Sequence, residues 1–79
     1  MKIKLNPELI IDDIDNGKII IEPQSGEGVF LDDESFLVIM AAQGDFIHIK
    51  SIYSPNYDKK EFIEFIDELL AAKILLSLE

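Results

Sequence analysis

Two turn signals divide the first half of this chain into three short apolar segments. Asn16-Gly17 accepts the positive φ angles of a two-residue hairpin turn. The segments on both sides of this turn are rich in Ile, a β-branched residue that is common in strands; they span residues 9–14 and 18–22. A second turn at residues 24–27 precedes a third apolar segment at residues 28–31. These local signals predict a three-stranded antiparallel meander.

Helical signals follow the meander. Asp32 or Asp33 is a suitable N-cap for a helix over residues 34–43, and Gly44 is placed to end that helix. Residues 46–53 show a weaker helical pattern, and their β-branched content makes a strand the alternative.

A further helix is predicted after Asp58. Phe62, Ile66 and Leu69 have the spacing of a buried helical stripe, and residues 74–76 resemble a tail packed under the sheet. We therefore expect a single α+β domain over residues 1–79 that is winged-helix-like, with a three-stranded antiparallel β-meander followed by three helices.

Composition limits the partners of such a domain. The chain has 79 residues, no Cys, and a net charge of −9 from 16 acidic and 7 basic side chains. This charge opposes binding to nucleic acid or to a phospholipid surface. It favours a partner with basic segments, or serves solubility alone. The N-terminus lacks the apolar stretch of a signal peptide, and no apolar run is long enough to span a membrane, so we expect a cytoplasmic protein.

No catalytic or metal-binding constellation is visible in the sequence. Placing Gly17 at the sixth position of a calcium loop puts Ile14 and Pro23 at ligand positions, which they cannot fill. His48 is the only His and has no Cys or second His to complete a metal site. We therefore expect no metal, no cofactor and no enzymatic activity.

The last predicted helix carries more apolar residues than one packing face requires. Ile63, Phe65 and Leu70 flank the buried stripe. They are either ordinary core of a small domain or the floor of a groove beside the third strand, and the sequence leaves both open. If the pleat of that strand places Val29 and Leu31 on the core face, Phe30 lies on the other face.

The order of these segments resembles the PqqD-like family, whose members are also called RiPP recognition elements. The resemblance covers about residues 5–76. Residues 16–21 look like the family's second strand, residues 25–32 like its turn and third strand, and residues 57–76 like its final helix and tail. Gly28 stands where members often carry an aromatic residue, and residues 46–53 lack the usual helix cap.

The resemblance implies a binding function. Such domains bind the leader of a ribosomally synthesised precursor peptide and present it to a modifying enzyme, such as a leader peptidase, a cyclase or a radical SAM enzyme. The leader adds as a strand beside the third strand, with its side chains in a groove beside the last helix. The alternative is a small protein-interaction or regulatory domain without this role. The implied peptide-binding residues are Gly28, Val29, Phe30, Leu31, Asp32, Ile63, Phe65, Ile66 and Leu70.

Overall fold

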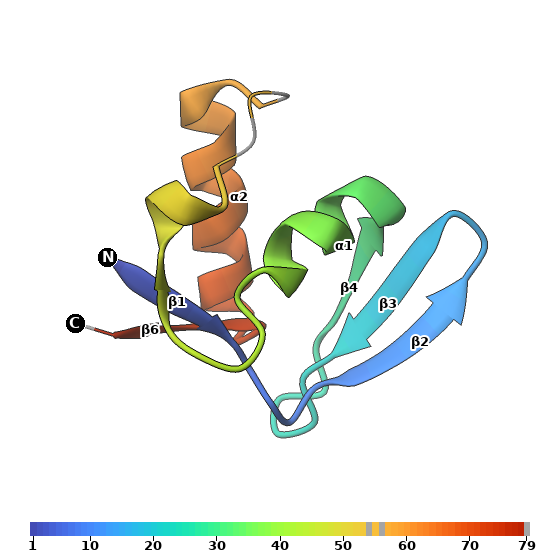
Figure 1. The fold of residues 1–79 in the computed structure, drawn as a ribbon. Helices are drawn as coiled ribbons and strands as arrows, with labels where there is room; N and C mark the ends of the chain where they lie inside the picture. The colour runs from blue at the N-terminus through green and yellow to red at the C-terminus, as the bar shows by residue number, and fades with distance from the viewer. Residues whose placement is uncertain (54, 56, 79) are drawn as a thin grey trace.

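The computed structural model describes residues 1–53, 55 and 57–78 (Figure 1). Within these residues, six strands, two α-helices and one short 3-10 helix form a small α+β domain. In chain order, the elements are β1 (Lys2–Leu5), β2 (Ile10–Ile14), β3 (Gly17–Ile21), β4 (Gly28–Asp32), α1 (Asp33–Met40), β5 (Ile47–His48), the 3-10 helix η1 (Ile49–Ser51), α2 (Lys59–Ala71) and β6 (Leu75–Leu78).

The strands form two three-stranded antiparallel sheets. One sheet has the order β2-β3-β4 and is the predicted meander. The other has the order β5-β1-β6, so β1 lies between two strands that come from much later in the chain. Figure 1 shows the meander on one side of the molecule and the β1–β6 pair on the other, with α1 beside the meander and α2 above β6.

The expected winged-helix-like fold with three helices is wrong. Residues 46–53 contain β5 and η1 rather than an α-helix, which agrees with the β-branched Ile47 and Ile49 in this segment. The expected C-terminal tail lies in the region of β6, which pairs with β1. Residues 2–5, for which no strand is predicted above, form the central strand of the second sheet.

The first helix begins as predicted and ends early. Asp32 is the N-cap of α1, and its side chain accepts a hydrogen bond of 2.7 Å from the Ser35 N–H. The helix stops at Met40 rather than at residue 43, and Gly44, with φ of 97°, lies beyond its end. Gly44 therefore serves the turn toward β5 and is not the residue that directly follows the helix.

One apolar core joins the two sheets and both helices. Phe62, Ile66 and Leu69 of α2 are 1–2% exposed, which confirms the predicted stripe. Ile20 and Leu31 reach this core from the meander, and Val29 packs against it. The remaining buried apolar residues of the core are Ile3, Leu5, Ile39, Ala42, Ile52, Ala72, Ile74 and Leu75.

The turn between β3 and β4 is organised by a buried carboxylate. Glu22 is 4% exposed, and its side chain accepts hydrogen bonds from the Gln24 N–H (2.8 Å) and the Ser25 N–H (3.0 Å). Its backbone carbonyl also accepts the Gly26 N–H. The bond from Gln24, with that from Ser25, outweighs desolvation and lowers the pKa of Glu22 below its ordinary value of 4.5.

This lowered pKa predicts an acid-dependent contribution to stability. A carboxylate with a depressed folded-state pKa stabilises the fold above its unfolded pKa and loses that effect as the pH falls through the folded pKa. Glu22→Gln should therefore lower the melting temperature at neutral pH, with the difference from the unmodified protein shrinking below pH 4.5. Thermal melts of both proteins across the acid range measure this difference, and a difference that stays constant would contradict the assignment.

Candidate peptide-binding groove

The outer edge of β4 is open. β3 is the only strand that pairs with β4 among the described residues. At the two ends of this pairing, the Glu22 N–H donates to the Glu27 carbonyl (3.0 Å) and the Asp33 N–H donates to the Asn16 carbonyl (3.3 Å). Hydrogen-bonded and non-hydrogen-bonded pairs alternate along an antiparallel ladder, so these two bonds fix the direction of the backbone groups between them.

This alternation assigns each residue of β4 to one edge. Val29 and Leu31 direct their backbone N–H and carbonyl groups toward β3, because they lie an even number of residues from Glu27 and Asp33. Gly28 and Phe30 direct these groups toward the open edge, as does the N–H of Asp32. The open edge therefore offers donors and acceptors at every second residue, as an added strand requires.

Two neighbouring hollows lie beside this edge. The first, of about 300 Å³, is lined by residues 29–32 of β4, by Ser35, and by Phe65, Glu68 and Leu69 of α2. The second, of about 230 Å³, shares Phe65 and Glu68 with the first and adds Tyr57, Glu61 and Glu64. We refer to the two hollows together as the β4–α2 groove.

Aromatic and hydroxyl contacts hold the groove in shape. The ring of Phe65 stacks on that of Tyr57, with centroids 5.7 Å apart and an interplanar angle of 14°. The Tyr57 hydroxyl lies 2.8 Å from the Ser35 hydroxyl, in a hydrogen bond between the segment before α2 and the first turn of α1. The apolar floor at Phe65 is thereby formed before any ligand arrives, which lowers the entropy lost on binding.

The groove is acidic. Glu61, Glu64, Glu68 and Asp32 all line it, and no basic residue is among the residues that line its two hollows. The hydrogen bond from the Ser35 N–H holds the pKa of Asp32 below its ordinary value, so this carboxylate is charged at neutral pH. The charge of the groove therefore favours a cation over an anion.

The outer face of the meander, which is turned away from the core, is apolar as well. Phe30 is 51% exposed, which confirms that it lies opposite Val29 and Leu31. The register places Ile19 beside Phe30, and the strand alternation puts Ile10, Ile14 and Ile21 on the same face. Ile10 and Ile14 are 49% and 44% exposed, so an added strand would meet apolar side chains on this face too.

The structure brings together six of the nine residues suggested from the sequence. Gly28 to Asp32 form the edge, and Phe65 lines the groove. Ile66 is 1% exposed and belongs to the core, and Leu70 is half-buried against the core without lining the groove. Ile63 lines a different cavity, between α2 and η1.

Sequence reasoning does not single out Ser35 or Tyr57 as groove residues, and it identifies Glu68 only as part of the acidic face of the last helix. Two of these residues have a signal in the sequence: Tyr57 is an aromatic residue just before a predicted helix start, and Glu68 belongs to the acidic face of that helix. Their place beside β4 depends on how α2 is rotated against the meander, which neither signal specifies. Ser35 lines the groove and forms a hydrogen bond with Tyr57, which lies 22 positions later in the chain.

Neither helix in the described part of the chain is both long and apolar enough to cross a membrane. Comparison of the chain with protein-family models, with curated proteins and with solved structures gave no match.

Proposed function

We propose that this chain is a non-catalytic peptide-binding protein that receives an extended segment as an additional strand on β4. The segment we propose is the leader of a ribosomally synthesised precursor peptide, which the chain presents to a peptide-modifying enzyme. The observation that carries the proposal is the open edge of β4 beside a preformed apolar and acidic groove.

An added strand would bind through its main chain and through the side chains on both of its faces. Its main chain would bond the outward-facing groups of Gly28, Phe30 and Asp32. Because side chains alternate along a strand, one set would enter the groove toward Phe65 and the other set would lie on the outer face beside Phe30. Main-chain bonds then supply affinity, and the two side-chain surfaces supply specificity.

The charge of the groove indicates the composition of the peptide. Glu61, Glu64 and Glu68 line it from α2, so Lys or Arg near the apolar anchors would be attracted and would speed the encounter. The resemblance described above supports the choice of a leader segment, since it implies binding between the third meander strand and the last helix.

Leader binding is tested by titrating the ¹⁵N-labelled protein with synthetic peptides that cover the leader regions of short precursor genes beside its own gene. We expect saturable amide shifts across residues 28–32, 35 and 61–69, with a dissociation constant of about 1 μM or below. Peptides that bind this edge without any relation to a precursor would support the alternative of a general protein-interaction domain. Shifts confined to the Asn16-Gly17 turn would contradict the proposed site.

Two variants of Phe30 separate main-chain pairing from side-chain contact. Phe30→Ala removes the ring, whereas Phe30→Pro also removes an N–H that faces the open edge and not β3. We expect the Pro variant to bind the leader about tenfold more weakly than the Ala variant, since one hydrogen bond is lost. Equal affinities would contradict strand addition, provided that both variants show the circular dichroism spectrum of the parent.

The groove itself is tested by a matched pair on α2. Phe65→Ala removes the apolar floor, and Ile63→Ala removes an exposed apolar residue on the other flank of the same helix. We expect an affinity loss of about tenfold for Phe65→Ala and little change for Ile63→Ala. The reverse order would place the peptide on the other side of α2.

A further inference from the structure

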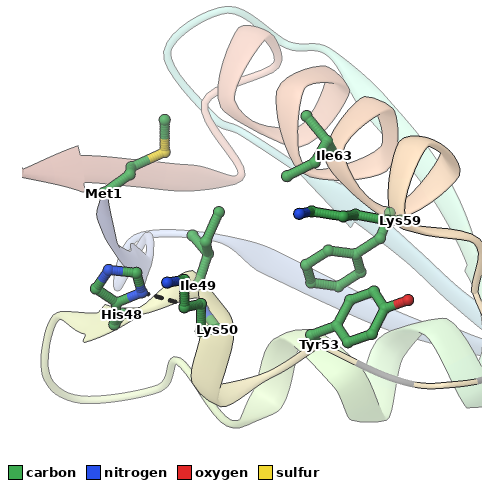
Figure 2. A pocket seen from close by; sticks show the side chains of 8 residues that line it. Met1, His48, Ile49, Lys50, Tyr53, Lys59 and Ile63 are labelled. Atoms are coloured by element: carbon green, nitrogen blue, oxygen red, sulfur yellow. Dashed lines mark hydrogen bonds between the residues drawn. The ribbon is translucent and has the colours of Figure 1, made fainter.

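Another cavity lies on the other side of α2, between this helix and η1 (Figure 2). Its volume of about 530 Å³ is within the range of small-molecule sites in proteins. Ile49, Tyr53, Phe62 and Ile63 form apolar walls. None of these residues lines the β4–α2 groove, so the two sites are separate.

Aromatic packing builds one wall of this cavity. The rings of Tyr53 and Phe62 are perpendicular, with centroids 5.1 Å apart. Phe62 is anchored in the core at 2% exposure, whereas Tyr53 and Ile63 are 42% and 37% exposed. The cavity therefore has a fixed base and accessible apolar sides, on which an apolar ligand would be partly shielded from water.

The cavity is lined by basic side chains and by no carboxylate. His48, Lys50 and Lys59 line it, and no Asp or Glu does, although acidic residues outnumber basic ones by 16 to 7 in the chain. Among the described residues, no carboxylate lies within ion-pair distance of the Lys50 or Lys59 ammonium groups. Figure 2 shows the Lys59 side chain extending from α2 with its nitrogen toward the cavity.

The position of these charges strengthens the local positive potential. Lys59 and Lys60 are the first two residues of α2, at the end of the helix where the macrodipole is positive and cations are unfavourable. The Nδ1 atom of His48 accepts the Lys50 N–H (3.2 Å), so Nε2 carries the ring hydrogen and remains a donor. An anion in this cavity is therefore favoured by the start of α2, by the two ammonium groups and by the imidazole N–H.

We propose that this cavity binds a small anionic amphiphile, with an apolar body of the size of a medium-chain acyl group and a carboxylate or phosphate head. The body would lie against Tyr53, Phe62 and Ile63, and the head would pair with Lys50 and Lys59. Such a molecule complements an apolar wall that lies next to ammonium groups without an ion-pair partner among the described residues.

Titration of the ¹⁵N-labelled protein with decanoate and with decyl phosphate, each below its critical micelle concentration, tests the proposal. We expect saturable shifts of amides in residues 48–53 and 59–63, and the tighter of the two ligands identifies the preferred head group. Decanol, which has the same apolar body without charge, should bind about tenfold more weakly. Equal binding of decanol, or tighter binding of decyltrimethylammonium, would overturn the proposal.

Lysine variants complete the test. Lys59→Met should weaken decanoate binding about tenfold. Lys60→Met, at the neighbouring position of the same helix turn, removes a charge that does not line the cavity and should weaken binding by no more than about twofold. Equal losses for the two variants would show a general charge effect and overturn the proposal. A leader peptide that fails to bind would leave this result unaffected, because its site involves other residues.

Discussion

Phe62→Ala is expected to lower the free energy of unfolding by about 3–5 kcal/mol. The Phe62 side chain is 2% exposed and belongs to the core shared by both sheets. Its ring also contacts Tyr53 edge-on and Tyr57 at a centroid distance of 6.1 Å, so its removal takes one aromatic contact from each of these two rings. A domain of 79 residues has a total stability of only about 4–12 kcal/mol, so this variant should be largely unfolded under mild denaturant.

Phe65→Ala is the matched control for this prediction. The same atoms are removed one helical turn away, but Phe65 is only half-buried and stacks on Tyr57 alone. Urea denaturation of both variants should show a clearly smaller loss for Phe65→Ala. Equal losses would mean that Phe65 is ordinary core, and the β4–α2 groove would then lose its apolar floor.

The meander could be predicted because its signals are local. Asn16 adopts the left-handed region with φ of 67°, and Gly26 does so with φ of 75°. The first turn differs by one residue from the predicted Asn16-Gly17 turn, because Gly17 pairs with Ile14 as the first residue of β3 and has no positive φ, which leaves Asp15 and Asn16 as the turn residues. Each strand pairs with the next one along the chain, so two turns and three apolar segments specify the whole sheet.

The second sheet could not be predicted in the same way. Lys2 pairs with Leu78 and Leu5 with Leu75, across almost the whole chain, and no turn connects them. Lys2, Ile3, Lys4 and Leu5 alternate between polar and apolar, and this alternation is a local signal that favours a strand at β1. Its partners still depend on the packing of the complete core around Ile3 and Leu5, which no local pattern contains.

The candidate site was predictable in outline only. The sequence identifies a strand edge and a helix with surplus apolar residues, but not which flank of the helix meets the strand. Ile63 and Phe65 are two positions apart and therefore point about 200° apart around α2. Because Phe62, Ile66 and Leu69 point into the core, the two flanks of α2 face different elements. Phe65 lies beside β4, and Ile63 lies beside η1. Two neighbouring residues of one predicted site thus belong to two different cavities.

Gly17→Ala should be the most damaging glycine substitution in the meander. A Cβ atom at Gly17 would collide with the Leu31 carbonyl oxygen and would lie 2.6 Å from the nearest atom of the Phe30 ring. The ring can rotate, but the carbonyl is a backbone atom of β4, so β3 and β4 must separate locally. We expect a loss of about 1–3 kcal/mol in the free energy of unfolding, as for other overpacked sites.

Gly28→Ala provides the comparison, since Gly28 lies in β4 opposite Ile21 at the other end of the same strand pair. Its added Cβ would meet the side chains of Ile21, at 3.7 Å, and Ile19, at 4.0 Å, which are ordinary van der Waals contacts. The free energy of unfolding of Gly28→Ala should stay within about 1 kcal/mol of the parent value, because the lost freedom of the unfolded chain offsets any small cost of the added contacts. Because Leu31 lies between Phe30 and Asp32, Gly17→Ala should also displace the open edge and weaken leader binding. Denaturation curves of the two variants that coincide would contradict the close approach of β3 to β4 at Gly17.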